Sequence, residues 1–184
     1  MPKISQYSST TPVSGDQFVL ARAGSNYRTD FSNLNKVVQA VHTQTGAVAT
    51  GATTIPNDDS IPQNTEGNEW MTKAITPISA TNKLLIEAIL HMSHGSSATS
   101  LIAALFQDSA ANALAASEIY QDTAGTVRQL TLRHEMPAGT VIATTFKIRG
   151  GANGAGTVTL NGASGARLLG GVLLSSLRIT EFTP

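Results

Sequence analysis

The feature that most constrains this chain is the alternation of apolar and polar residues between residues 83 and 93. Every second position is apolar, and these positions are Leu84, Ile86, Ala88, Leu90 and Met92. Successive side chains of a β-strand point to opposite faces, so the segment is predicted to be a strand with one face in a core. The opposite face is mostly polar but also carries Leu85 and Ile89. A sheet face in contact with water is normally polar, so these two apolar residues are expected to be covered by something outside the sandwich core.

Other segments alternate in the same way. Their apolar positions are, in chain order, Leu130 and Leu132, then Ile142, Phe146 and Ile148, and finally Leu173, Leu177 and Ile179. Turn-forming stretches such as "MPAGT", "GGANGAG" and "NGASGA" separate the strand candidates. The stretch "ANALAASEIY" is rich in helix-forming residues, but its length and its place after a turn favour a strand. Many short strands, without a long amphipathic helix after residue 45, predict an all-β fold of the jelly-roll β-sandwich type.

Length, composition and charge exclude several classes of protein. A chain of 184 residues is long enough for one domain whose core needs neither disulfide nor metal. The absence of cysteine excludes disulfide frameworks and thiol catalysis, and the formal net charge of zero argues against nucleic acid as a partner. The longest apolar stretch, "LLGGVLLSSL", is about half of the roughly 20 residues that a membrane span requires. We therefore expect no membrane insertion, and the first residues show no apolar core of an export signal.

The N-terminal segment, residues 1–36, has a different pattern. It predicts a short strand over residues 18–22, a turn at residues 24–26 and a second short strand, followed by Asp30 as the cap of a short helix. The apolar stripe of that helix would be Phe31, Leu34 and Val38. About 35 residues bury too little apolar area to fold alone, so this segment is predicted to attach to a partner surface. From Val37 the pattern returns to strand, and residues 37–184 are predicted to form the sandwich domain.

Several phrases of the chain, in this order, carry a resemblance to a known family. They are "TGAVATGATTIPNDDSIPQNTEGNEWMTKAITPISATNKLLIE", "LIAALFQDSAANALAA", "LRHEMPAGTVIATTFKIRGG", "TVTLNG" and "GGVLLSSLRITEF". Residues 37–184 resemble a module at the C-terminal ends of bacteriophage tail-fibre and related virion structural proteins. The opening 34 residues are similar to the N-terminal segments of phage fibre, spike and decoration proteins, which dock onto the virion. The resemblance implies a jelly roll, commonly in a trimer, without catalytic activity, but the chain has no repeat or coiled coil that would form a long shaft.

The predicted virion-attachment residues are the larger apolar and aromatic side chains of the N-terminal segment. They are Phe18, Leu20, Tyr27, Phe31 and Leu34.

Candidate chemical sites are few. His91 and His94 would point to opposite faces of a strand, so joint metal binding would need a bend, and histidines at a loop end are the simpler interpretation. One loop gathers three acidic side chains that could bind calcium, although they match no EF-hand spacing and also suit an ordinary turn: Asp58, Asp59 and Glu66. "GGANGAG" lacks the lysine and helix of a phosphate loop, and the surroundings of Ser164 do not form a nucleophile elbow. We expect no catalytic residue, no cofactor and no resident metal.

Trp70 and Tyr120 are the aromatic residues best suited to stacking on a sugar. The alternative for Trp70 is that it caps the sandwich. Aromatic residues make up only 5% of the chain, which is few for a carbohydrate-binding groove.

The sequence thus predicts a homotrimeric, non-enzymatic phage structural protein, a fibre or spike component located on the virion after assembly in the host cytoplasm. Two other functions stay open: a receptor-binding tip that recognises host-surface glycan, and a capsid decoration or head-fibre protein. Other virion proteins are the expected partners. The strand candidate "SLIAALFQD" is apolar on both faces, so another subunit is predicted to cover one of them. The predicted interface residues are Leu85, Ile89, Leu101, Ala103 and Leu105.

Overall fold

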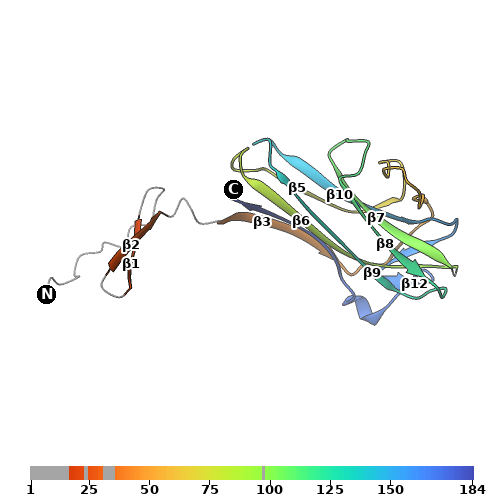
Figure 1. Ribbon diagram of the computed structural model, residues 1–184. Helices are drawn as coiled ribbons and strands as arrows, with labels where there is room; N and C mark the ends of the chain where they lie inside the picture. Colours follow the sequence, from red (N-terminus) through yellow and green to blue (C-terminus); the bar gives the residue numbers. More distant parts are fainter. Residues whose placement is uncertain (1–16, 23–24, 31–35, 97) are drawn as a thin grey trace.

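The computed structural model describes residues 17–22, 25–30, 36–96 and 98–184 (Figure 1). Strands β1 (Gln17–Arg22) and β2 (Ser25–Asp30) form an antiparallel two-stranded sheet of their own, in which Leu20 lies opposite Tyr27. The hairpin predicted near the N-terminus is therefore confirmed. Phe31 and Leu34 of the predicted helix stripe lie outside the described residues.

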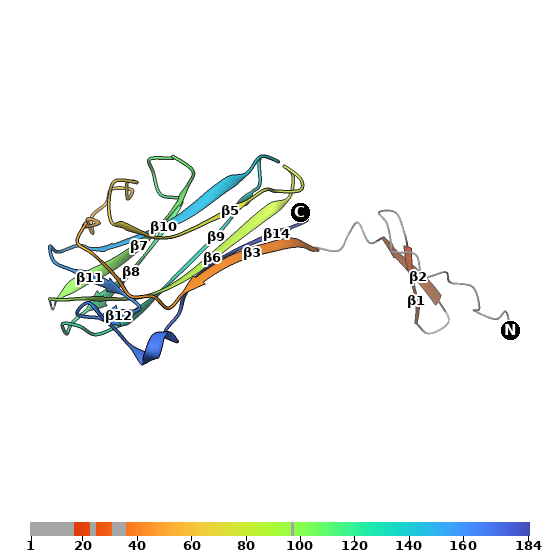
Figure 2. The ribbon, with the colours of Figure 1, turned by 180° about the vertical axis from the view of Figure 1, so that it is seen from behind.

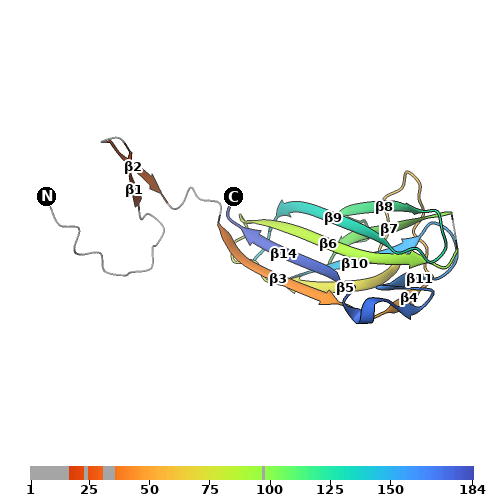
Figure 3. The same cartoon turned by 90° about the horizontal axis from the view of Figure 1, so that it is seen from below.

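The remaining strands build a two-layer sandwich. Its eight main strands are β3 (Val37–Thr45), β5 (Asn68–Ile75), β6 (Lys83–His94), β7 (Thr99–Gln107), β8 (Ala115–Gln121), β9 (Arg128–Pro137), β10 (Thr144–Ala152) and β14 (Ser175–Phe182). One sheet has the order β5-β10-β7-β8, and the other contains β3, β14, β6 and β9, with β9 paired to β6. Figure 2 shows the molecule from behind, and Figure 3 shows the β3-β14-β6-β9 sheet in front of the other layer.

Short elements complete the fold. They are β4 (Ala49–Gly51), β11 (Val158–Leu160), β12 (Gly162–Ala163), β13 (Ala166–Arg167) and the 3-10 helix η2 (Leu169–Gly171). β11 pairs with the end of β6 and with β4, which widens the β3-β14-β6-β9 sheet at one end.

Strand pairing defines the topology. The first main strand pairs with the last, β3 with β14; the second pairs with the seventh, β5 with β10; the third with the sixth, β6 with β9; and the fourth with the fifth, β7 with β8. All four pairs are antiparallel, so the chain is a long hairpin rolled into two sheets. This arrangement is the jelly roll, and it confirms the predicted fold class.

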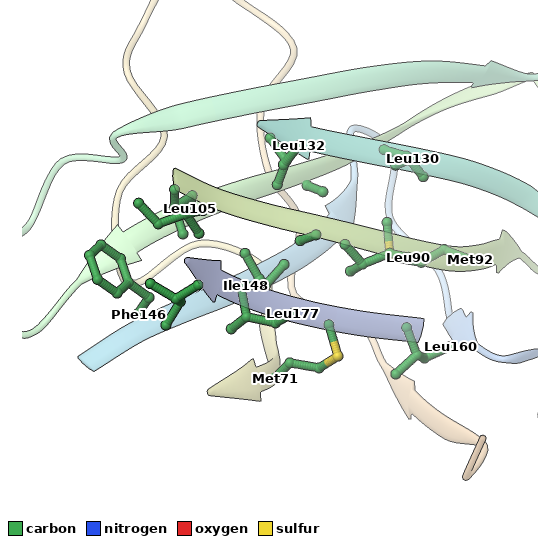
Figure 4. Close-up of a cluster of buried hydrophobic side chains, with 14 of the residues drawn as sticks. Met71, Leu90, Met92, Leu105, Leu130, Leu132, Phe146, Ile148, Leu160 and Leu177 are labelled. Atoms are coloured by element: carbon green, nitrogen blue, oxygen red, sulfur yellow. The ribbon is translucent and has the colours of Figure 1, made fainter. Parts of the chain in front are cut away.

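The core lies between the two sheets (Figure 4). All five inward residues predicted for β6 are buried, and they face buried residues of the other sheet such as Leu101, Leu105 and Ile148. Leu130 and Leu132 of β9, and Leu177 and Ile179 of β14, are buried in the same cluster. The period-two alternation therefore predicted the core-facing side of the β3-β14-β6-β9 sheet correctly.

The strand interpretation of "ANALAASEIY" is also confirmed, because its second half is β8. Three apolar residues were placed wrongly. Ile142 is 73% exposed in the loop before β10, which begins at Thr144. Leu173 precedes β14 rather than belonging to it, and Val38 lies in β3 rather than in a helix. For Ile142 and Leu173 the apolar alternation was extended past the end of the strand, whereas Val38 was assigned to a helical stripe although β3 begins at Val37.

The long loop of residues 52–67 lies over the outer face of the β5-β10-β7-β8 sheet. Arg149, on that face of β10, donates hydrogen bonds to the carbonyls of Glu66 and Gly67, each at 2.7 Å. The backbone N–H of Ile55 donates to the carbonyl of Ala152 at 3.1 Å. These bonds fasten the loop to the sheet.

Glycine permits this close contact. A Cβ added at Gly151 would lie 3.1 Å from Cγ1 of Ile55 and 2.6 Å from the carbonyl oxygen of Thr53. Gly151 is the strand partner of Ile102, so the fully buried Ile55 lies beside the outer face of β7. The loop thereby helps to bury that face, and its apolar residues are Ile102, Ala104 and Phe106.

The C-terminal strand β14 lies inside its sheet, between β3 and β6. Near its end, the buried carboxylate of Glu181 accepts hydrogen bonds from the backbone N–H groups of Ile78 and Ser79. It also accepts side-chain hydrogen bonds from Gln39 and Asn82, both at 2.6 Å. Burial, the largest single influence, opposes ionisation, but these hydrogen bonds together outweigh it and lower the pKa of Glu181 below its ordinary value of 4.5. Glu181 thus ties the loop between β5 and β6 to the C-terminus.

Candidate functional site

The outer face of the β3-β14-β6-β9 sheet has the arrangement expected of an interaction surface. In the register of the sheet, Ile89 of β6 lies between Ser176 of β14 and Thr131 of β9. Both neighbours are short, so Ile89 stays 37% exposed. It lines a hollow of about 250 Å³ with residues of the two flanking strands.

Charged residues form the rim of this hollow. One step along the sheet from Ile89, Glu87 of β6 lies between Arg178 of β14 and Arg133 of β9. Nε of Arg133 is 3.9 Å from Oε1 of Glu87, and both side chains are exposed, so this ion pair contributes little stability. Arg178 makes no ion pair within the part of the chain that the structure describes. The hollow therefore combines an apolar floor with a rim in which positive charge exceeds negative charge.

The same surface continues onto β3. A second hollow of about 440 Å³ is lined by Ala40, His42 and Gln44 of β3, and it shares Ser176 and Arg178 with the first. Small and polar side chains thus extend across the sheet from β9 to the edge strand β3.

The predicted interface residues fall into two groups. Leu85 is half-buried and Ile89 is partly exposed, and both lie on the outer face of β6. Leu101, Ala103 and Leu105 are buried in the chain's own core, so their prediction as interface residues is wrong. The prediction failed because it required another subunit to cover one face of β7. The opposite sheet buries one face and loop 52–67 helps to bury the other.

A second surface lies on the other side of the sandwich, where loop 52–67 meets β8. A groove of about 200 Å³ is lined by Asn57, Asp58, Ile102 and Glu118, among others. A neighbouring groove of about 420 Å³ shares Asp58 with it and is also lined by Ile61, which is 55% exposed. This surface is acidic where the first is basic.

The geometry of the loop does not support the calcium alternative. Oδ1 of Asp58 accepts hydrogen bonds from the hydroxyl and from the backbone N–H of Ser60, and these bonds lower the pKa of the Asp58 carboxyl group. Oε2 of Glu66 instead accepts from the backbone N–H of Gln63 at 2.8 Å. Within the described residues, no group of three His, Cys, Asp or Glu side chains could hold a metal ion, and this includes Asp58, Asp59 and Glu66. The acidic residues are turn-forming groups in this structure.

The two histidines do not form a site together. The His94 side chain is buried, and its Nδ1 accepts a hydrogen bond from the backbone N–H of Ser96 at 3.1 Å. His91 lies on the other side of β6, where its Nε2 is 3.2 Å from Oε1 of Gln129. His94 is the last residue of β6 and His91 lies inside that strand, so the interpretation as loop-end histidines fits His94 alone.

The aromatic candidates for sugar stacking differ. Trp70 packs against the core, and its Nε1 donates a hydrogen bond to the carbonyl of Gly150 at 3.1 Å. Its side chain is only partly buried, so glycan contact stays a prediction for Trp70, beside the alternative that it closes the sandwich. Tyr120 is 55% exposed on the edge strand β8. Its position, two residues from Glu118, is beside the acidic groove.

Only three of the five predicted attachment residues lie within the described part of the chain. Phe18 and Leu20 lie in β1 and Tyr27 lies in β2. Phe31 and Leu34 lie outside the described residues. Attachment to a virion stays a prediction for all five.

Sequence reasoning missed Arg133 and Arg178 as partners of Ile89 and missed Ile61 as an exposed apolar residue. Alternation along β9 and β14 places both arginines on outward faces. However, only the pairing of β6 with its two neighbours brings them to the same hollow.

No protein-family model matches the sequence, and no curated protein matches it. Among solved structures, the chain is similar to Eiger TNF from S. frugiperda, with 8% identity and a TM-score of 0.45 over 77% of this chain and 92% of that chain. It is similar to a chain of infectious bursal disease virus, Gx strain, with 12% identity and a TM-score of 0.35 over 90% of this chain and 44% of that chain. A third similarity is to the enzymatically active domain of tailspike protein 4 of bacteriophage CBA120, with 17% identity and a TM-score of 0.28 over 68% of this chain and 19% of that chain.

The chain thus spans less than half the length of these two viral chains. At such low scores the similarities carry no argument about function, and the jelly-roll assignment rests on the strand pairing. No helix in the described part of the chain is long and apolar enough to cross a membrane.

Proposed function

We propose that this protein is a non-enzymatic structural component of a bacteriophage virion, displayed on the particle as a homotrimer. The observation that carries the proposal is the outer face of the β3-β14-β6-β9 sheet. It presents Ile89 in an open hollow, whereas the corresponding face of the other sheet is covered by loop 52–67. Burying an apolar side chain of this size is worth roughly 1.5 to 3 kcal/mol. Because only 37% of Ile89 is exposed, a second copy of the chain, held by cyclic symmetry, would gain about a third of this energy, roughly 0.5 to 1 kcal/mol, in each contact.

The N-terminal hairpin supports the attachment part of the proposal. Among the strands that the structure describes, β1 and β2 pair only with each other. A sheet of only two strands is marginal in water, so it needs a partner to be stable. In the proposed function, this partner is another virion protein, and the sandwich projects from the attachment point.

Two measurements test the proposal. Light scattering of the purified chain at micromolar concentration should give the mass of three chains; a mass of one chain would exclude the homotrimer. Antibody labelling of intact particles should place the protein on the virion surface. Labelling confined to the tail would support a fibre or spike component, and labelling spread over the head would instead support a decoration protein.

Attachment is tested by deleting residues 2–35. The shortened chain should still fold and form the oligomer but should be absent from purified particles, because it lacks the hairpin. Normal incorporation would show that the sandwich itself carries the attachment surface.

A second function, recognition of a host-surface glycan, is favoured by the position of Tyr120. Its side chain is 55% exposed beside a groove lined by Asn57, Asp58 and Glu118. An aromatic face with nearby amide and carboxylate groups can stack on a sugar ring and bind its hydroxyls. Glycan-array binding that is lost on Tyr120→Ala but retained on Tyr7→Ala would support this function. Absence of binding to every glycan on the array would count against it.

A further inference from the structure

Charge is distributed unevenly over the surface of the sandwich. Segments 52–67 and 108–121, which form the acidic grooves, contain no lysine or arginine. Their acidic residues are Asp58, Asp59, Glu66, Asp108 and Glu118. The whole chain carries 12 basic and 12 acidic residues, so the basic residues lie outside these two segments. Two of them, Arg133 and Arg178, lie at the rim of the Ile89 hollow.

Ile61 forms an apolar projection beside the acidic grooves. Ile61 is 55% exposed and lies two residues beyond Asp59. Two hydrogen bonds fix the loop around Ile61. The carbonyl of Ile61 accepts one from Nε2 of Gln63, and the carbonyl of Pro62 accepts one from the backbone N–H of Ala113. A fixed loop loses little conformational entropy when it binds.

The Ile89 hollow is complementary to this projection in polarity and in charge. The hollow has an apolar floor and a rim that includes Arg133 and Arg178, and Arg178 makes no ion pair within the described residues. The projection has an apolar tip with two carboxylates beside it. Complementary charge of this kind selects a partner and its orientation more than it adds affinity.

We infer that residues 56–62 of one copy dock on the Ile89 hollow of the next copy, with Ile61 against Ile89 and with Asp58 and Asp59 facing Arg133 and Arg178. This inference rests on the self-association proposed above and specifies the surface that faces the hollow. The two surfaces lie on the outer sides of different sheets, so the contact is heterologous. A heterologous contact generates a closed ring when its rotation allows closure, as a trimer requires.

Charge reversal tests the inference. Arg178→Glu and the double variant Asp58→Arg/Asp59→Arg should each weaken self-association by about 100-fold, because like charges then face each other. The variant that combines Asp58→Arg/Asp59→Arg with Arg133→Glu and Arg178→Glu should recover an oligomer of the original mass, because opposite charges then face each other again. Arg167→Glu, an exposed reversal on β13, is the matched control and should leave the mass unchanged. Thermal unfolding of each variant would verify that the monomer is intact.

Cross-linking supplies an independent readout, because the chain has no cysteine of its own. Ile61→Cys and Ile89→Cys, purified separately and given different mass tags, should form a mixed disulfide dimer when mixed and oxidised. Ile142→Cys, at an exposed site elsewhere, should not cross-link efficiently to Ile61→Cys.

The outcomes distinguish this inference from the proposed function. A mass of one chain for the unmodified protein would overturn both. An oligomer that survives Arg178→Glu and gives no mixed disulfide would overturn the docking of residues 56–62 and leave the homotrimer standing. A dominant disulfide between two Ile89→Cys chains would show that the hollows face each other, which also overturns it.

Discussion

The outer face of the β5-β10-β7-β8 sheet is covered by the chain's own loop, whereas the outer face of the β3-β14-β6-β9 sheet is open. Under the loop, Ile102, Ala104 and Phe106 are buried as deeply as the core between the sheets. On the open face, Leu85 and Ile89 stand among serine, threonine, glutamate and arginine. The comparison shows that a strand with apolar residues on both faces has its second face covered by other residues. The pattern does not indicate whether those residues belong to the same chain or to another one.

The largest expected effect concerns the covered face. Phe106→Asp places a carboxylate on the outer face of β7, at a side chain that is only 1% exposed. Burying an unpaired charge without compensation should lower the free energy of unfolding by more than about 4 kcal/mol, so the protein should fail to fold in soluble form. Phe106→Leu, the matched control, should cost only about 1 to 2 kcal/mol. Soluble, cooperatively unfolding Phe106→Asp would show that this face is open in solution.

The next effect concerns the tie between the open sheet and the loop before β6. Glu181→Gln removes a buried carboxylate that accepts hydrogen bonds from four donor groups. The substitution should lower the free energy of unfolding by about 2 to 3 kcal/mol. The folded-state pKa of Glu181 is lowered, so its ionised form stabilises the fold above the unfolded-state pKa, and this contribution is lost as pH falls through the folded-state pKa.

Denaturant titrations from pH 7 down to pH 3 measure this contribution. The stability difference between the original chain and Glu181→Gln should be constant above about pH 5 and should shrink below it. Glu87→Gln, at an exposed site on the same sheet, is the control and should show a much smaller dependence. A difference that grows on acidification would contradict the assigned role of Glu181.

A smaller effect is expected where the loop is fastened to the covered face. Arg149→Met removes the two hydrogen bonds to the carbonyls of Glu66 and Gly67 and should cost about 1 to 2 kcal/mol. Hydrogen–deuterium exchange should increase mainly in residues 55–67. Lys147→Met, on the same face of β10, removes only an ion pair at 4.0 Å and should change stability by less than about 0.5 kcal/mol. Unchanged exchange in the loop of Arg149→Met would mean that other contacts hold it.

The sequence predicted the face that each strand turns to the core better than it predicted what lies on the other face. The alternation in β6, β9 and β14 identified core residues correctly, because the period of a strand is a local property. Loop 52–67 has few bulky residues and no periodicity, so its course over β7 could not be predicted. The fit of Ile55 against Gly151 depends on residues far apart in the chain.

The candidate site shows the same division. Ile89 was identified because it interrupts a polar face within one strand. Arg133 and Arg178 are 44 and 89 residues away from it in the chain, and only the register of β6 with β9 and β14 brings them to its hollow. Ile61 carried no periodic signal at all, since it lies between turn-forming residues.

The smallest expected effect on the monomer concerns Ile89→Asp. Its side chain is 37% exposed with short neighbours, so a carboxylate there stays in contact with water, and the free energy of unfolding of the monomer should change by less than about 1 kcal/mol. Self-association, by contrast, should be lost, because the carboxylate would have to be desolvated in the subunit contact.

Light scattering and chemical unfolding of the same sample, below and above the association concentration, separate the two effects. Thr131→Asp, at the strand partner of Ile89 on the same face, should also prevent assembly, whereas Ile142→Asp, on the loop before β10, should not. If Ile89→Asp assembles normally, the open face is a solvent-exposed surface, and the difference between the two sheets reflects only where the long loop happens to lie.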